Sequence, residues 1–124
     1  MINQLRLKWG LPKVGAITSL VAAATPLAAY LLSTGRTCNV RKVHIWNRNP
    51  GTAQVQIGTG TAPFVPAIPA LFAVGAGMDV EIVPDQLQDV EFSADITVQS
   101  SVGAAAPNDV QVQVSVEEYP GPNG

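Results

Sequence analysis

The chain has one histidine, His44, and one cysteine, Cys38, so the residue types that most often perform nucleophilic or metal chemistry are scarce. Nucleophilic catalysis needs a nucleophile, a base within hydrogen-bond reach and a group that orients the base. A zinc site needs three or four histidine or cysteine ligands. The sequence therefore predicts no catalytic set, no metal site and no internal disulfide. We expect His44 beside Trp46 on an outer or interface face, and Cys38 as a small buried side chain.

Carboxylates are the remaining candidates for acid–base chemistry. Glu91 and Asp95 lie four residues apart on one face of an expected strand, about 13 Å apart at the rise of a strand. Glycoside hydrolysis needs two carboxylates closer than this, so the pair predicts a solvated face. Calcium is the other use for such oxygen ligands. Four acidic residues are available, at a spacing that matches no known calcium-binding loop: Asp79, Glu81, Asp85 and Asp89.

Two short stretches resemble sites for nucleic acids or phosphates. The segment RKVHIW (41–46), with Arg48, mixes basic and aromatic residues as nucleic-acid-binding surfaces do. The chain as a whole opposes that use, because its net charge is −2 and its pI is about 5.1. The segment GTGT (58–61) follows a strand but opens no helix, so it predicts no phosphate cradle. We expect no cofactor and no nucleic-acid partner.

Charged residues are few, and the two signs are separated along the chain. They make up 13% of the residues; all seven basic residues precede residue 49, and all nine acidic residues follow residue 78. Such asymmetry indicates charged partners or self-association. Alternatively, neighbouring strands pair these charges within one fold. The sequence leaves both interpretations open.

Residues 14–33, VGAITSLVAAATPLAAYLLS, form an uncharged run that follows Lys8 and Lys13. Such a run resembles a signal peptide or a membrane-spanning helix. Pro26 interrupts it, however, and its many alanine, threonine and serine residues give only modest hydrophobicity. The run therefore predicts short strands, and we expect no membrane partner.

Alternation of apolar and polar residues with period two predicts strands that each bury one face. It is clearest in DVQVQVSVEEY (109–119), where every second residue from Val110 to Val116 is valine. The same alternation occurs at 39–47, 53–58, 78–83 and 89–101. The residues expected in the core are Val43, Ile45, Val55, Ile57, Val80, Ile82, Phe92, Ile96, Val112 and Val114.

Turn residues separate these segments, and no window shows sustained helical periodicity. In 62–72, prolines recur at spacing three; proline lacks the backbone donor of a sheet ladder, so this segment predicts an edge strand or an extended loop. A chain of 124 residues can bury a sufficient core as one domain. The sequence predicts an all-β, single-domain β-sandwich of about eight strands, jelly-roll-like, over residues 14–119.

The two ends differ from this core. Residues 1–13 predict an extended N-terminal arm, and residues 120–124 a flexible tail. The arm alternates apolar and basic residues: Leu5, Leu7, Trp9 and Leu11 on one side, Arg6 and Lys8 on the other. Such a segment can add as a strand to a neighbour's sheet edge, with Trp9 as the anchor. It can also be the first strand of its own sandwich, and the sequence leaves that alternative open.

The order of features in STGRTCNVRKVHIWNRNPGTAQVQIGTG (33–60) is a glycine turn, a strand ending in IWN, a polar turn and a strand with QVQIG. A loop rich in proline and alanine follows, then VGAGMDVEIVP, VEFSADITVQSS and the valine-alternating strand. Over about residues 15–118 this order resembles the small jelly-roll decoration, or cement, proteins of tailed-bacteriophage virions. The resemblance is one of pattern without a diagnostic motif, and the basic N-terminal arm departs from it.

The resemblance implies a non-enzymatic virion structural protein that binds and stabilises the capsid lattice at its surface. Its expected partners are the major capsid protein or another virion protein, and further copies of itself in a homotrimer. The alternative is a carbohydrate- or ligand-binding β-sandwich in which Trp46, Tyr30 and Tyr119 stack on sugars. Exposed aromatic residues clustered at one end of the molecule would favour that alternative.

The segment TAPFVPAIPALFAVGAG (61–77) has more apolar residues than a solvent-covered loop of a monomer would expose. It therefore predicts contacts between subunits around a symmetry axis, most simply a threefold axis. The residues expected at an interface with the capsid or a neighbouring subunit are Arg6, Lys8, Trp9, Lys13, Phe64, Val65, Ile68, Leu71 and Phe72.

Overall fold

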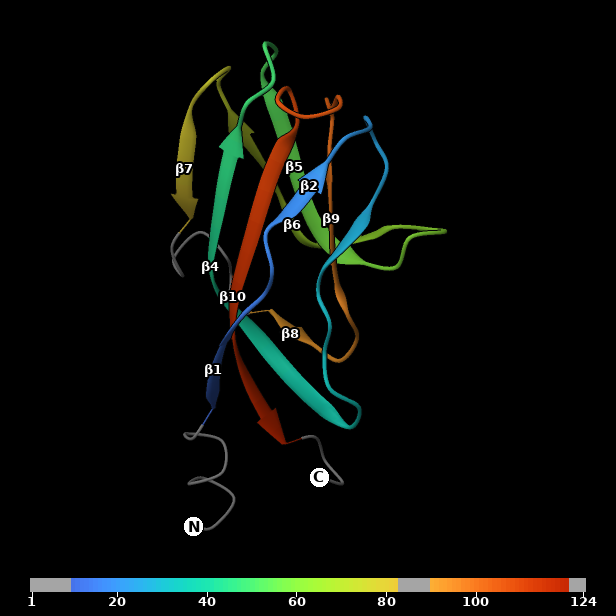
Figure 1. Ribbon diagram of the computed structural model, residues 1–124. Coiled ribbons are helices and arrows are strands. Elements are labelled where there is room, and N and C mark those ends of the chain that lie inside the picture. Colours follow the sequence, from blue (N-terminus) through green and yellow to red (C-terminus); the bar gives the residue numbers. More distant parts are fainter. Residues whose placement is uncertain (1–9, 83–89, 121–124) are drawn as a thin grey trace.

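The computed structural model describes residues 10–82 and 90–120, except for the side chains of residues 69 and 70 (Figure 1). The described residues form ten strands and no helix. The strands are β1 (Leu11–Val14), β2 (Thr18–Leu20), β3 (Leu27–Tyr30), β4 (Arg36–Asn47), β5 (Ala53–Thr59), β6 (Val65–Val74), β7 (Asp79–Ile82), β8 (Glu91–Phe92), β9 (Ile96–Ser100) and β10 (Val110–Pro120). The described part of the chain contains no helix that is long and apolar enough to cross a membrane.

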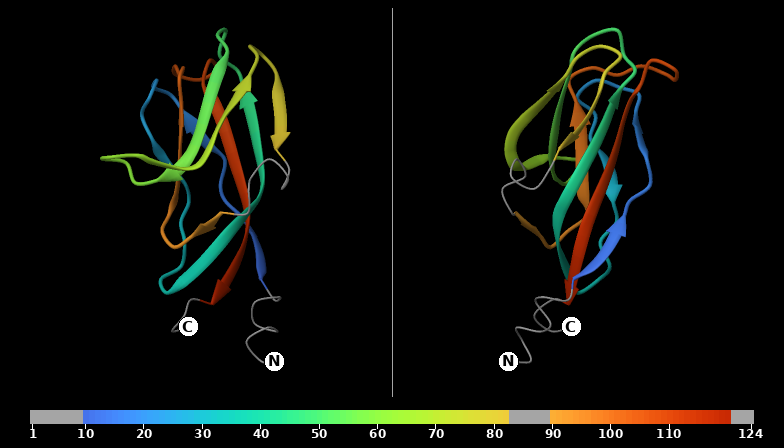
Figure 2. Two further views of the ribbon diagram at one scale, coloured as in Figure 1. Left: turned by 180° about the vertical axis from the view of Figure 1, so that it is seen from behind. Right: turned by 90° about the vertical axis from the view of Figure 1, so that its left-hand side faces the viewer.

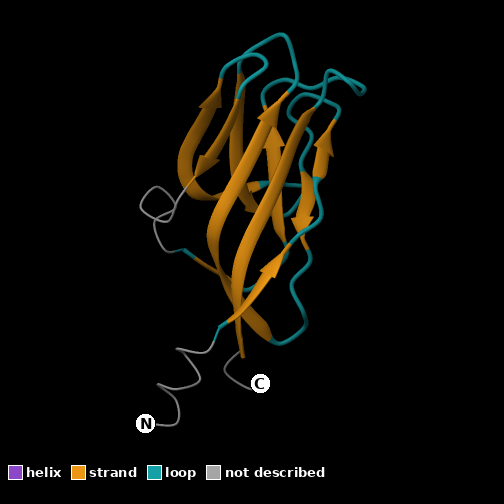
Figure 3. Ribbon diagram, turned by 60° about the vertical axis from the view of Figure 1, so that its left-hand side comes forward, coloured by secondary structure: helices purple, strands orange, loops and turns teal. Residues whose placement is uncertain are grey.

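The strands form two antiparallel sheets that face each other (Figures 2 and 3). Sheet A has the order β1-β10-β4-β7; β2 also pairs with β10, and β8 also pairs with β4. Sheet B has the order β3-β9-β5-β6. The pairs are nested along the chain, because β2 pairs with β10, β3 with β9, β4 with β7 and β5 with β6. Nested antiparallel pairs wrapped into two sheets make a jelly roll. The predicted all-β, jelly-roll-like sandwich is confirmed.

The core lies between the two sheets and contains the residues that period-two alternation selects. Nine of the ten expected core residues are buried, and Val80 is half-buried against the same cluster. β10 is central in sheet A, and Val110, Val112 and Val114 are fully buried there. At about 25 cal/mol per Å² of apolar surface, burying each valine stabilises the fold by about 1.5 kcal/mol or more.

The segment expected as a single strand over 89–101 is two strands in different sheets. β8 pairs with β4 in sheet A, whereas β9 pairs with β3 and β5 in sheet B. Ala94, which the period-two alternation of this segment places on the inner face with Phe92 and Ile96, is exposed in the turn between them. Phe92 in sheet A and Ile96 in sheet B face the same core from opposite sides. The sequence alternation therefore runs on where the chain crosses from one sheet to the other, and it does not reveal that crossing.

β4 begins three residues before its expected start and contains a β-bulge. Val40 and Val43 both face the core although they are three positions apart, and the register against β10 skips Arg41. One extra residue reverses which positions face inward. This bulge explains why a single period-two pattern does not describe the whole strand.

Residues 11–13, expected in the arm, belong to the sandwich. β1 pairs antiparallel with β10, with Leu11 opposite Glu118 and Val14 opposite Ser115. These residues therefore follow the alternative in which the segment begins the protein's own sheet, whereas residues 1–9 lie outside the described part of the chain. At the other end, Pro120 is the last residue of β10 rather than the start of a tail.

The proline-rich segment forms β6, an edge strand of sheet B, as one of the two expectations for it stated. Its register against β5 shifts twice, and Pro66 lies opposite Gly58. A Cβ atom on Gly58 would lie 2.0 Å from the carbonyl oxygen of Val65. The close approach of these two backbones therefore requires glycine at residue 58.

Candidate interaction surfaces

Every charged residue in a described strand belongs to sheet A. The strands of sheet B contain no aspartate, glutamate, lysine or arginine. Within sheet A, β4 supplies basic residues and lies between β10 and β7, which supply acidic ones. The separation of charge along the chain thus becomes pairing between neighbouring strands, which is one of the two interpretations left open by the sequence.

One such group lies where β4 meets β10. The Nη2 atom of Arg41 donates hydrogen bonds to Oε2 of Glu117 at 3.3 Å and to the Tyr119 hydroxyl at 3.2 Å. The Tyr119 hydroxyl donates to the same Glu117 oxygen at 2.6 Å. The hydrogen bond with Tyr119 and the charge of Glu117 raise the pKa of Arg41, against the effect of burial. The hydrogen bond to Glu117 and then burial raise the pKa of Tyr119.

A second group lies between β4 and β7. The Nε2 atom of His44 lies 2.9 Å from Oδ2 of Asp79, and Nζ of Lys42 lies 3.9 Å from Oε2 of Glu81. The His44 ring stacks on Trp46 with a centroid distance of 3.9 Å and an interplanar angle of 11°. His44 therefore lies beside Trp46 on the outer face, as expected, and its neighbours are carboxylates rather than a nucleophile.

Metal binding finds no support in the described residues, where no group of three or more histidine, cysteine, aspartate or glutamate side chains is placed to hold an ion. Of the four acidic residues considered for calcium, Asp79 and Glu81 lie on β7 and pair with β4. Asp85 and Asp89 lie outside the described residues.

A buried ionic cluster closes the core at the end of β10. Glu118 is fully buried; it accepts a hydrogen bond from the Tyr30 hydroxyl, and its Oε1 atom lies 2.9 Å from Nε of Arg36. The Arg36 contact is a close ion pair without the direction of a hydrogen bond. Burial and the Glu118 carboxylate raise the pKa of Tyr30. The alternation of β10 places Glu118 on the same face as Val116, a signal that sequence reasoning missed.

Asp109 forms a similar cluster at the other end of β10. It is 1% exposed, accepts a hydrogen bond from the Ser19 hydroxyl, and accepts one from Nε of Arg48 at 2.9 Å. Burial alone would raise its pKa, but the donors from Ser19 and Arg48 outweigh burial and lower it. Both buried carboxylates join distant segments of the chain and serve the fold.

The structure distributes the expected interface residues unevenly. Val65 and Leu71 of β6 are 54% and 53% exposed, whereas Ile68 is buried in the protein's own core. Phe64 and Phe72 are half-buried, and Phe72 packs against that core. The Lys13 side chain on β1 is about half exposed, 4.0 Å from Oε1 of Glu118. Arg6, Lys8 and Trp9 lie outside the described residues.

A second apolar surface was not predicted. It comprises residues on or next to β1 and β2 of sheet A and β3 of sheet B, and β2 contacts β3. Its residues are exposed by between 37% and 72%: Leu11, Val14, Ile17, Val21, Leu27 and Leu31. The signal was the uncharged run at 14–33, which we interpreted only as strands built from small residues.

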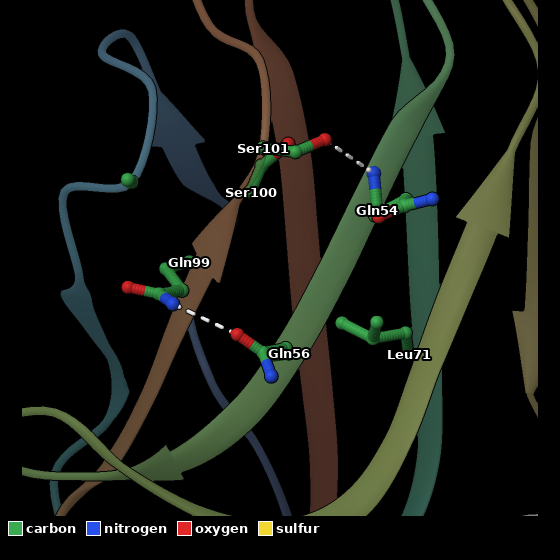
Figure 4. Close-up of a pocket in the computed structure, with 7 residues that line it drawn as sticks. Gln54, Gln56, Leu71, Gln99, Ser100 and Ser101 are labelled. Atoms are coloured by element: carbon green, nitrogen blue, oxygen red, sulfur yellow. Dashed lines mark hydrogen bonds between the residues drawn. The ribbon is translucent and has the colours of Figure 1, made fainter.

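The outer face of sheet B holds a shallow groove of about 280 Å³ (Figure 4). Gln99 donates a hydrogen bond to Gln56 across β9 and β5 at 2.9 Å, and the Ser101 hydroxyl accepts one from the backbone of Gln54. Leu71 of β6 borders it. The described residues that line the groove carry amide, hydroxyl and methyl groups, with neither a charge nor an aromatic ring. Such a surface suits contact with another neutral surface.

No protein-family model matches this chain, and no curated protein sequence matches it either. Among solved structures, a chain of the disulfide-linked pili that form Bacillus endospore appendages is similar, with a TM-score of 0.54 and 13% identity over 90% of this chain and 88% of that one. At that identity the likeness shows a shared fold alone.

Two viral proteins give weaker matches. A chain of the cyanophage Pam1 capsid has a TM-score of 0.43 and 16% identity over 89% of this chain and 85% of that one. The coat protein of Tobacco streak virus has a TM-score of 0.45 and 8% identity over 90% and 86%. These likenesses add nothing to the fold established above.

Proposed function

We propose that this chain is a non-enzymatic virion structural protein, a decoration or cement protein that binds the capsid lattice and stabilises it as a symmetric oligomer. One observation supports the proposal most: all strand charges lie in sheet A, and sheet B has an uncharged outer face. Interface cores are depleted in charged residues. Sheet B and the exposed apolar residues of the edge strands therefore suit burial in an assembly, while the charged face of sheet A suits contact with water.

Within this proposal, the exposed apolar residues of β6 contact neighbouring copies around a threefold axis. Val65 and Leu71 are the described residues of the predicted set that are free to do so. The basic arm, with Arg6, Lys8 and Trp9, binds an acidic surface of the major capsid protein, another virion protein or an adjacent copy; Lys13 extends the basic surface on β1. Such contacts need neither a cofactor nor a catalytic residue.

The test is whether the chain is built into a large symmetric particle. Particles from the source organism are separated by density, and the chain is detected in each fraction by antibody and mass spectrometry. We expect the chain in the particle fractions, at a fixed stoichiometry that persists after a salt wash. A chain found only in the soluble fraction, as a monomer, would rule the proposal out.

The carbohydrate-binding alternative has less support from the geometry. Tyr30 is buried in the core. Trp46 and Tyr119 lie at opposite ends of the β4–β10 pair, because Tyr119 is opposite Thr37, nine residues before Trp46 on β4. At about 3.3 Å per residue the two positions are about 30 Å apart. The aromatic residues thus do not cluster at one end, which was the feature that would have favoured a sugar site.

A further inference from the structure

β7 forms an edge of sheet A that carries negative charge. It pairs with β4 on one side, and none of the described strands pairs with its other side. Figure 1 shows it at the margin of the sheet. Asp79 and Glu81 point to the outer face, opposite Trp46 and His44, and their side chains are 61% and 51% exposed. An unpaired edge offers backbone donors and acceptors to an added strand.

We propose that residues 5–9 of a second copy, LRLKW, pair with this edge of β7 as an added strand. Arg6 and Lys8 are two residues apart, as are Asp79 and Glu81, so each pair shares one face of its strand. The added strand thus places both cations beside both carboxylates on the outer face. Its apolar residues lie on the side of Val80, above the core. Opposite charges paired across strands stabilise such an arrangement.

The other sheet edges fit this segment less well. β6 contains Pro66, which lacks a backbone donor, and its register is twice interrupted. β3 carries no charge to match the two cations. The opposite edge of sheet A, at β1, carries Lys13 and would repel them. Among the described residues, acidic side chains border a sheet edge at the four-residue strand β7 and at the two-residue strand β8, and of these only β7 carries two acidic residues on one face of the strand.

Residues 5–9 are poorly placed to pair with β7 of their own molecule. β1 and β7 lie at opposite edges of sheet A, with β10 and β4 between them. A position beyond β7 is about 19 Å from β1 at the usual strand spacing. Crossing that distance takes about six residues at full extension. Of residues 1–9, about three would remain, too few to pair with β7.

The negative charge of the β7 edge also determines which strand can pair with it. Two β7 edges repel each other, whereas a basic strand is attracted, so the charges favour one pairing and oppose the other. The contact joins the β1 side of one copy to the β7 side of the next, and is therefore head-to-tail. In a closed ring, residues 5–9 of every copy pair with a β7 edge, and every β7 edge is occupied. The inference rests on the proposed function, since it names a contact that joins copies in the symmetric oligomer in addition to the contact of β6.

The test uses the full chain and two charge reversals. One variant carries Arg6→Glu with Lys8→Glu, and the other carries Asp79→Lys with Glu81→Lys. Mass is measured by light scattering over a concentration series, with circular dichroism as the check on folding. We expect each variant alone to associate about tenfold more weakly, or worse, than the parent chain. An equal mixture of the two should regain association, because every reversed segment then meets a reversed edge.

The matched control, Asp79→Glu with Glu81→Asp, keeps the charge and should keep the parent mass. Since β7 changes can disturb folding, the arm variant decides the outcome. A folded arm variant that keeps the parent mass would overturn the inference. So would two folded variants that each lose mass and do not regain association when mixed. An oligomer that persists in both variants counts against this contact and leaves the proposed function standing. A parent chain that is monomeric and absent from particles counts against both.

Discussion

Single residues show where this fold tolerates a charge and where it does not. Val112 and its neighbours alternate between a dry interior and a wet face, but Glu118 and Asp109 put carboxylates on the inner side. Each is tolerated because a cation and a hydroxyl contact it. The positions of those partners, rather than polarity, decide what a buried site accepts.

Val112→Asp should destabilise the protein by several kcal/mol, because it buries a carboxylate among valines and isoleucines without a prepared cation. Gln111→Asp, one residue away on the outer face, should be near neutral. Gln113→Asp also loses a hydrogen bond to the Gly15 carbonyl and should cost about 1 kcal/mol. Urea unfolding measures all three, and equal midpoints for the changes at 111 and 112 would contradict the assigned faces.

Asp109 should make stability depend on pH in the acid range. Its pKa in the folded protein is below the ordinary value of 3.8, so the folded state holds its proton less tightly than the unfolded chain. Its contribution is therefore complete above the unfolded pKa and is lost as pH falls through the folded pKa. Asp109→Asn should remove that part of the slope. Unfolding free energies measured between neutral pH and the acid limit for both proteins test this, and identical slopes would refute it.

Cys38 should be chemically inert while the protein is folded. Burial, followed by the nearby Glu118 and Glu91 carboxylates, raises its pKa to about 12. The thiolate is the reactive form, so almost none is present at neutral pH. A chromogenic disulfide reagent should react slowly with the native protein and at once after denaturation. Rapid reaction in the native state would show that the thiol is accessible.

At the scale of elements, pairing rather than pattern determines the role of each strand. β1 is exposed along its whole length, yet its backbone pairs with β10 over four residues. β8 and β9 share one alternation and belong to different sheets. Because the backbone ladder holds such strands, side-chain burial is a poor guide to their importance.

Two truncations should separate the arm from the sheet. Removing residues 1–9 should leave the melting temperature nearly unchanged, because the chain retains β1 and all its pairing with β10. Removing residues 1–14 also deletes that strand and uncovers an edge of β10, so the melting temperature should fall. Thermal unfolding followed by circular dichroism measures both. An equal loss in the two truncations would mean that residues 1–9 contribute to the fold.

At the scale of the whole molecule, the described strands form one charged sheet and one uncharged sheet, and large apolar residues are exposed on β6 and on or next to β1, β2 and β3. The uncharged stretch between residues 49 and 78 supplies β5 and β6, and the uncharged run at 14–33 supplies β2 and β3. All four strands therefore present uncharged surface, which loses little favourable hydration when a neighbouring molecule covers it. Because the opposite charges pair within sheet A, the outer face of sheet A is charged and the outer face of sheet B is not.

Light scattering at micromolar concentration should show an oligomer, with a trimer as the expected mass. Val65→Glu with Leu71→Glu should reduce that mass without lowering the melting temperature, because both side chains are half-exposed and outside the core. Gln111→Glu on the outer face of sheet A is the control and should leave the mass unchanged. A parent chain that is a stable monomer would contradict the predicted contact around β6.

The sequence by itself determined what depends on neighbouring residues: that the chain is β, which residues of the clearly alternating segments face inward, and that the proline-rich segment is an edge strand or an extended loop. Period-two alternation carries this information because each side chain's face is set by the pleat. It could not determine the crossing between β8 and β9, the bulge at Arg41 or the place of β1, since these depend on pairing partners.

The candidate surfaces divide in the same way. The uncharged stretches and the acidic and basic halves were visible in the sequence. Only the tertiary structure showed that Ile68 belongs to the core, that basic β4 lies between two acidic strands, and that Tyr30 meets Glu118. That last contact joins residues 88 positions apart. Its energy depends on a distance that only the folding of the whole chain fixes, and no local pattern encodes it.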